Sequence, residues 1–144
     1  MEKYDCLKLD NQLCFPLYAC SREIVKQYTP YLEPLGLTYT QYVTMMALWE
    51  HEVLSVKEMG RLLYLDSGTL TPVLKKLEEK GLVNRRRSRE DERSLIVSLT
   101  EAGVALKERA VEIPYHIADV LKLSNEDAKM LYELLHKMLD TYHD

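Results

Sequence analysis

The sequence contains no apolar run long enough to cross a membrane, and its N-terminus lacks the basic-then-apolar pattern of a secretion signal. Both absences predict a cytoplasmic protein with no membrane partner, in a compartment that keeps thiols reduced. Glycine and proline are scarce, with five residues each among 144, and 47% of the residues are hydrophobic. This composition excludes a disordered or collagen-like chain and favours one ordered domain spanning residues 1–144.

Cysteine is also scarce, and its distribution excludes two common uses of the thiol. The three cysteines, Cys6, Cys14 and Cys20, all lie in the first twenty residues. Cys14 and Cys20 would lie about 9 Å apart on one continuous helix, beyond the roughly 7 Å between Cα atoms that a disulfide allows. The same spacing does not suit a zinc site, so we expect no metal and no other cofactor. The thiols are therefore either buried or reactive.

The net charge of −4 argues against a generic binder of polyanions, but the charge is uneven along the chain. Residues 67–93 contain eight Lys or Arg and five Asp or Glu and so carry +3, whereas the remaining residues carry −7. A basic segment on an acidic body suits local contact with phosphates. Charged runs are also common on ordinary solvated surfaces, so other features must decide.

Long amphipathic helices are predicted at both ends of the chain, over about residues 8–35 and 104–143, because apolar residues recur there at three- and four-residue steps. Pro30, Pro34 and Gly36 end or bend the first of them. Neither end has anything of its own to pack on, so we expect these helices to form the dimerisation layer of a homodimer. The stripe on the first helix consists of Leu13, Leu17, Cys20, Ile24, Tyr28 and Tyr31.

The middle of the chain, about 38–100, is typical of a winged helix-turn-helix. Two capping boxes and a tight turn start three successive helices, and the apolar period then changes to that of two strands around a charged tip. These five features lie at 38–41, 55–58, 66–68, 82–88 and 94–100. A short helix, a turn, a second helix and a hairpin define that layout. The predicted fold class is mainly α with a small β-hairpin wing.

The helix that follows the turn is the candidate for reading DNA, because a helix-turn-helix presents the N-terminal residues of its second helix to the major groove. Gly68 removes a side chain where the backbone would come nearest. Small hydroxyls and cations suit close approach to phosphates and base edges. On the face opposite the apolar stripe the helix offers Ser67, Thr69, Thr71, Lys75 and Lys76. An ordinary capped surface helix would share these features.

The arginine-rich hairpin decides in favour of double-stranded DNA as the partner. Arg85, Arg86 and Arg87 can reach backbone phosphates, and an arginine at the tip can enter a minor groove.

Two stretches of the chain resemble a known family. The run Leu-Asp-Ser-Gly-Thr-Leu-Thr-Pro at 65–72, followed by Asp91 and Arg93, is similar to the MarR (multiple antibiotic resistance regulator) family of winged-helix repressors. The run Asn-Gln-Leu-Cys-Phe at 11–15, with Leu-Thr-Tyr ending at Tyr39, is similar to its organic hydroperoxide resistance regulator branch. The resemblance implies a homodimer that binds a pseudo-palindromic operator until it is oxidised. It also implies that Arg93 is the minor-groove arginine and that Asp91 orients it.

The cysteines differ in the roles that their positions favour. Cys20 shares a stripe with apolar residues, so we expect it to be buried as a small hydrophobe. Cys6 lies in an N-terminus that we expect to fray. Cys14 lies off the main stripe, and we hypothesise that Pro16 makes the regular helix begin beside it. Free N–H groups and the helix dipole would then stabilise its thiolate. The residues alone favour a packing role for Cys14 over this one.

The resemblance implies that Cys14 is the redox-sensing cysteine and that Tyr28 and Tyr39 contact its thiolate. Fourteen residues separate Cys14 from Tyr28, about 21 Å along one helix, so the two cannot touch within a chain. They can meet only if the first helix of a second copy runs antiparallel. Tyrosines at these positions are otherwise ordinary aromatic core.

No cysteine lies in the last two helices. In the family that the chain resembles, members that form an intersubunit disulfide use a second cysteine in that region. The resemblance therefore implies a one-cysteine sensor that needs a low-molecular-weight thiol, or overoxidation, to stay off DNA. Two other functions stay open: a winged-helix repressor that responds to a small aromatic ligand, with incidental cysteines, and a thiol peroxidase using Cys14.

Overall fold

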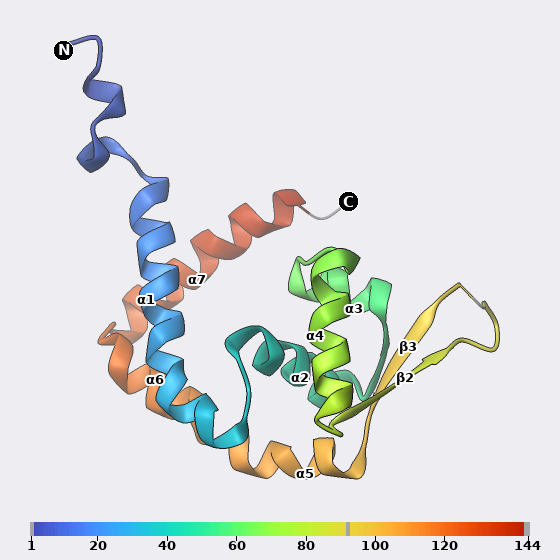
Figure 1. The fold of residues 1–144 in the computed structure, drawn as a ribbon. Helices are drawn as coiled ribbons and strands as arrows, with labels where there is room; N and C mark the ends of the chain where they lie inside the picture. Colours follow the sequence, from blue (N-terminus) through green and yellow to red (C-terminus); the bar gives the residue numbers. More distant parts are fainter. Residues whose placement is uncertain (1, 92, 143–144) are drawn as a thin grey trace.

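The structure is a computed structural model that describes residues 2–91 and 93–142. Its elements form two groups joined by α5 (Glu101–Ala110), which runs along the bottom of Figure 1. The helices on one side of α5 are α1 (Cys14–Leu32), α6 (Ile113–Leu121) and α7 (Asn125–Leu139). Those on the other side are α2 (Tyr39–His51), α3 (Val56–Leu63) and α4 (Ser67–Glu79). The mainly helical fold class is thus confirmed, but α1 is shorter than the predicted span of about 8–35, and three helices rather than two follow the hairpin. None of the helices in the described part of the chain has both the length and the apolarity to cross a membrane.

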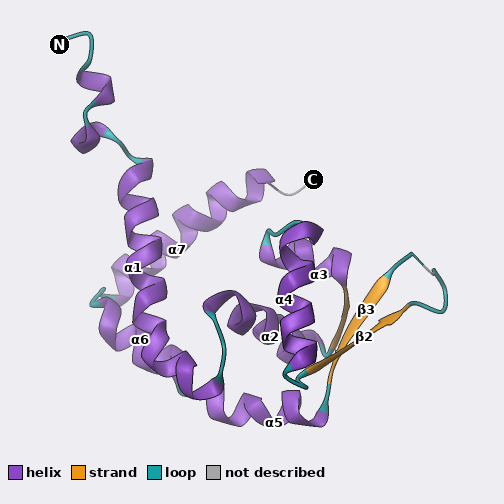
Figure 2. Cartoon of the chain, viewed as in Figure 1, coloured by secondary structure: helices purple, strands orange, loops and turns teal. Residues whose placement is uncertain are grey.

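A small antiparallel sheet completes the second group (Figure 2). The predicted hairpin is confirmed as β2 (Val83–Arg87) and β3 (Leu95–Leu99), but the sequence analysis missed a third strand, β1 (Val53–Ser55), on the other side of β3. The strand order is β1-β3-β2. A three-residue strand is too short to show a period of two, so only its pairing with β3 reveals it.

The core of the winged-helix unit is formed by apolar residues at the spacings the sequence shows. Leu70, Leu74 and Leu77 of α4 are fully buried, together with Met59 of α3 and Val97 of β3. These side chains fix α4 against α3 and the sheet, so its opposite face is left to solvent.

Helix capping occurs where the sequence predicts it. The Thr38 hydroxyl accepts from the Gln41 N–H and the Gln41 side chain accepts from the Thr38 N–H, which is a complete capping box. At the second predicted capping box, the Ser55 hydroxyl accepts from the N–H of Glu58. The Glu58 carboxylate accepts from the Ser55 hydroxyl, where a capping box would have it accept from the Ser55 N–H.

The segment before α1 projects away from the other elements in Figure 1, and α1 begins where it ends. Leu13, just before α1, is 86% exposed, and the expectation that Cys20 is buried is wrong within one chain, because Cys20 is exposed. The periodic stripe is present, but nothing in the described part of the same chain covers the N-terminal half of it. The physical reason is length, since the helix outruns α6, against which its other half packs.

The residues before α1 are ordered, contrary to the frayed end expected around Cys6. They form two 3-10 helices, η1 (Asp5–Leu7) and η2 (Leu9–Asn11). The Asn11 side chain donates to the carbonyl of Asp5 at 2.7 Å, and the Gln12 side chain donates to the carbonyl of Cys6 at 2.8 Å. Hydrogen bonds from side-chain amides to backbone carbonyls therefore hold the residues before α1, in place of a hydrophobic core.

Candidate functional site

The predicted recognition helix is α4, and its N-terminus is fixed by a side-chain cap. The Asp66 carboxylate accepts from the Thr69 N–H at 2.7 Å. Hydrogen bonding by Thr69, through its side chain and then its backbone, holds the pKa of Asp66 below its ordinary value. The cap therefore stays ionised at neutral pH, at the positive end of the helix dipole.

All six residues predicted on α4 to face DNA are exposed, whereas Leu70, Leu74 and Leu77 are buried. They are Ser67, Gly68, Thr69, Thr71, Lys75 and Lys76. The Thr71 hydroxyl donates to the Ser67 carbonyl at 2.7 Å, so its proton is engaged within the helix. The Lys76 ammonium lies 3.7 Å from the Glu79 carboxylate in an exposed pair, which a phosphate could replace.

Gly60 of α3 sets how closely α3 and α4 approach, a role that the sequence analysis missed. A Cβ at this position would lie 2.6 Å from the carbonyl oxygen of Leu65 and 3.5 Å from a methyl group of Leu70. The glycine therefore permits the tight turn of the helix-turn-helix. A glycine inside a short predicted helix, five residues before Leu65, was the feature of the sequence that could have indicated this role.

The wing carries the predicted arginines in two different environments. Arg86 and Arg87 are exposed on β2. Arg85 is half-buried, and its guanidinium lies 3.1 Å from the Glu78 carboxylate of α4, which also accepts from the Arg85 N–H. The hydrogen bonds from Arg85 hold the pKa of Glu78 below its usual value. This pair joins the base of the wing to the recognition helix.

Asp91 closes the turn at the tip of the wing. Its carboxylate accepts from the backbone N–H of Arg93 at 3.0 Å and from the Ser94 hydroxyl at 3.2 Å. The Arg93 side chain is exposed at this tip. Asp91 therefore fixes the backbone from which Arg93 projects.

Cys14 is the first residue of α1 and is exposed, with no side-chain cap on the helix start among the described residues. The hypothesis that the helix begins at this cysteine is thus confirmed. Pro16, in the first turn, has no N–H to donate, so the free donors of the helix start lie at or next to Cys14.

Tyr28 and Tyr39 are brought together from α1 and α2, with ring centroids 4.8 Å apart in an edge-to-face contact. Tyr42, which the sequence analysis did not single out, completes the cluster at 5.7 Å from Tyr28 and 6.2 Å from Tyr39. Its signal was a position one helical turn after Tyr39. Because Cys14 and Tyr28 lie on the same continuous helix, Cys14 does not join this cluster within one chain.

Burial raises the pKa values of all three phenols. It is the largest cause of the raised pKa of Tyr28, which reaches about 12, and the neighbouring rings of Tyr39 and Tyr42 add to it. Neutral phenols donate hydrogen bonds, and a thiolate brought against them would accept.

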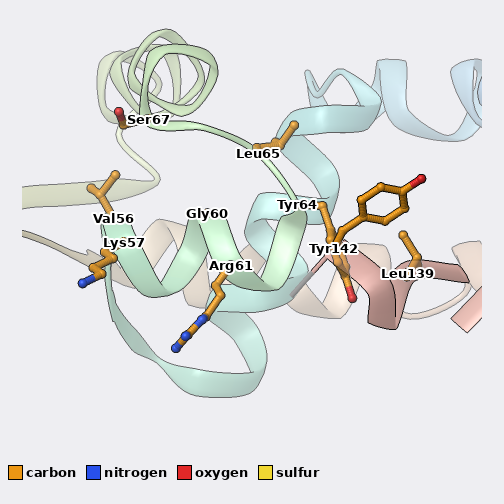
Figure 3. Close-up of a pocket in the computed structure, with 9 residues that line it drawn as sticks. All are labelled: Val56, Lys57, Gly60, Arg61, Tyr64, Leu65, Ser67, Leu139 and Tyr142. Atoms are coloured by element: carbon orange, nitrogen blue, oxygen red, sulfur yellow. The ribbon is translucent and has the colours of Figure 1, made fainter. Parts of the chain in front are cut away.

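A separate open hollow of about 820 Å³ lies between the helix-turn-helix and the C-terminal residues (Figure 3). Tyr64 and Leu65 of the turn line it, together with Leu139 and Tyr142 from the C-terminal end of the described chain. Lys57 and Arg61 add positive charge to its rim. Among the described residues, no group of three or more side chains is placed to hold a metal ion.

A recognition helix capped at its N-terminus, a tight helix-turn-helix and an arginine-bearing wing define a winged-helix DNA-binding regulator. Comparison with known proteins agrees with this class. Residues 26–110 match the family model described as transcriptional regulator SarA/Rot.

The chain is 57% identical over 141 residues to the organic hydroperoxide resistance transcriptional regulator of Bacillus subtilis, covering 98% of this chain and 96% of that protein. It is 43% identical over 136 residues to the regulator SarZ of Staphylococcus haemolyticus, covering 94% and 92%. The structure of reduced AbfR bound to DNA superposes with a TM-score of 0.79 at 37% identity, covering 98% and 99%. The chain belongs to the MarR family of transcriptional regulators, in its organic hydroperoxide resistance branch. This is a family of DNA-binding regulators and not of enzymes.

Proposed function

We propose that the protein is a homodimeric repressor that binds a pseudo-palindromic operator and releases it when organic hydroperoxide oxidises Cys14. The observation that carries the proposal is the separation, on one helix, of an exposed thiol from a cluster of neutral tyrosines. The two halves of such a sensor can meet only between two chains.

The exposed apolar surface supports the dimer. The uncovered part of α1 and the exposed apolar residues of α7 lie in the same group of helices. Burying such a surface against a second copy would stabilise the dimer through the hydrophobic effect. If the two α1 helices run antiparallel, Cys14 of each copy reaches Tyr28 and Tyr39 of the other.

The proposed chemistry begins with the Cys14 thiolate. Its sulfur attacks the terminal oxygen of the hydroperoxide, an S–O bond forms and the O–O bond breaks, and the alkoxide takes up a proton to leave as an alcohol. Sulfur is oxidised by two electrons to a sulfenic acid. A low-molecular-weight thiol then condenses with the sulfenic acid, forming a disulfide and water.

The mixed disulfide is the form we expect to release DNA. Its added bulk would displace the partner's tyrosines and shift the two wings relative to the operator half-sites. The similar protein AbfR has been solved bound to DNA in both its reduced and its overoxidised forms. That precedent favours thiol addition over overoxidation as the releasing event here.

The test is DNA binding measured with and without an alkyl hydroperoxide and a small thiol, for the wild type and for Cys14→Ser. We expect the wild type to release DNA and the variant to hold it. Cys20→Ser is the matched control, because Cys20 is an exposed thiol on the same helix and should leave release intact. Equal release by Cys14→Ser would refute the redox function and leave the DNA-binding function standing.

The hollow in Figure 3 supports a second candidate, a repressor that responds to a small aromatic ligand. Release of DNA by such a ligand from Cys14→Ser would favour it. A thiol peroxidase would instead consume hydroperoxide steadily in the presence of a reductant, rather than once per thiol.

A further inference from the structure

Lys80 of the winged-helix unit and Arg109 of the connecting helix α5 hold the loop between that unit and α1. This junction comprises residues 33–38, beginning with the 3-10 helix η3 (Glu33–Leu35). The Lys80 ammonium donates to the carbonyl of Gly36 and to the side-chain oxygen of Gln41, the latter at 2.9 Å. The Arg109 guanidinium of α5 donates to the carbonyl of Pro34 at 2.9 Å. Carbonyls at a helix C-terminus lack helical partners and attract cations.

The acceptor of Lys80 is also part of the turn that carries Tyr39. The Gln41 side-chain oxygen accepts from the Thr38 N–H at 3.1 Å as well as from Lys80. Tyr39 lies between these two residues, as the first residue of α2. Movement of the Tyr39 ring would therefore move the atoms that hold Lys80.

Lys80 also lies where the recognition helix joins the wing. It is the C-cap of α4, and the following residue, Gly81, begins the turn into β2. The Gly81 carbonyl accepts from the Thr100 hydroxyl at 2.6 Å, which ties this turn to the end of β3. One side chain thus connects the first turn of α2 to the root of both the recognition helix and the wing.

We propose that Lys80 is a positioning residue that couples the tyrosine cluster to the DNA-binding elements. The inference rests on the proposed function and adds the physical route by which oxidation reaches DNA. A direct phosphate contact is the competing role for this lysine. The geometry disfavours that role, because its ammonium already has two acceptors on the junction side and Lys80 lies at the C-terminal end of α4, away from the N-terminal residues Ser67 and Thr69.

The test compares the dissociation constant of the thiol-modified protein with that of the reduced protein. The DNA is a duplex selected from a random pool by reduced wild-type protein, and the modifying thiol is attached to Cys14 after peroxide treatment. We expect Lys80→Met to lower the oxidised-to-reduced ratio by about tenfold, the upper range for residues along a coupling route. Lys80→Arg keeps a cation at the position and should retain most of the wild-type ratio.

Lys76→Met is the matched control, because it removes the same charge from an exposed position on the same helix. It should weaken binding in both states alike and leave the ratio unchanged. A simple phosphate contact at Lys80 would give that same pattern, so a wild-type ratio for Lys80→Met overturns the inference.

Gln41→Glu covers the case in which Lys80→Met fails to fold. Its carboxylate still accepts from the Thr38 N–H and attracts Lys80 more strongly, so the ratio should rise above that of the wild type. An unchanged ratio would again overturn the coupling. If the wild type itself does not release DNA on oxidation, the proposed function fails and the coupling fails with it. A releasing wild type with an unaffected Lys80→Met refutes only the coupling.

Discussion

The ring of Tyr28 in α1 meets the ring of Tyr39 in α2 edge to face, with centroids 4.8 Å apart. This contact joins the helix that begins at Cys14 to the first turn of the DNA-binding unit. The proposed sensor and the winged-helix unit therefore pack against each other at this contact.

Substituting Tyr28 tests whether the phenols assist the thiolate. We expect Tyr28→Phe to slow the reaction of Cys14 with alkyl hydroperoxide by about tenfold to a hundredfold, the range for losing a hydrogen bond to a charged group. Trapping of the sulfenic acid during rapid mixing measures this rate. Tyr31→Phe is the control, since Tyr31 stacks on His116 outside the cluster. Equal rates for wild type and Tyr28→Phe would show that the phenol does not contact the reacting sulfur.

The same tyrosine sets an alkaline limit to stability. The pKa of Tyr28 is raised from 10.0 to about 12, mainly by burial. When folding raises the pKa of a phenol, the neutral phenol stabilises the fold fully at any pH below its pKa in the unfolded state. This stabilisation is lost as the pH rises through its pKa in the folded state. The melting temperature of the wild type should therefore fall between pH 10 and 12, and that of Tyr28→Phe should fall less. Full ionisation of every tyrosine by pH 10, followed by absorbance, would contradict this.

Arg85 and Arg86 are neighbours on β2 with different expected roles. Arg86→Met should lower the slope of log affinity against log salt by about one, because an exposed arginine can neutralise one phosphate. Arg85→Met should instead lower the melting temperature and leave that slope unchanged, because its guanidinium is paired with Glu78. A reduced salt slope for Arg85→Met would restore the phosphate contact predicted from the sequence.

Gly60 and Gly68 form a matched pair for the packing of the helix-turn-helix. Gly60→Ala should destabilise the protein by about 1–3 kcal/mol, as overpacking does, because the new Cβ would press on the Leu65 carbonyl. A Cβ at Gly68 would meet only the Asp66 carboxylate at 3.6 Å, an ordinary contact, so the free energy of unfolding of Gly68→Ala should be that of the wild type. Urea unfolding of both variants measures the difference. A stable Gly60→Ala would mean that α3 and α4 have room to separate.

Peroxide without thiol should leave much of the DNA bound. With three cysteines, all before residue 21, the chain has no thiol in α5, α6 or α7 to trap the Cys14 sulfenic acid. We expect substantial binding after stoichiometric peroxide alone and loss of binding once a small thiol is added, measured by fluorescence anisotropy. Complete release in a thiol-free assay would show that the sulfenic acid itself, or Cys6, is sufficient.

Sequence patterns were informative wherever the physics is local. Thr38, Asp66 and Ser124 cap helices where their side chains can reach an N–H three residues ahead. The spacing of the leucines in α4 shows which face of the helix is buried. Gly81 ends the segment with a positive φ of 76°. The family and the class of protein followed from such local features and from the resemblance carried by residues 65–72.

Burial and pairing were decided only by the tertiary structure. The stripe of α1 predicted a buried Cys20, but periodicity says which face is apolar and not what covers it. Strand β1 was invisible because three residues carry no period. Arg85 was predicted to contact phosphate like Arg86 and Arg87, but in the tertiary structure it pairs with Glu78 of α4. Lys80 gave no signal at all, since its acceptors, Gly36 and Gln41, lie far away along the chain. Most helices and the hairpin could be predicted from the amino-acid order, because caps and periods act within a few residues. The tertiary structure alone decided which side chains meet across elements, because those contacts depend on how the helices and strands pack.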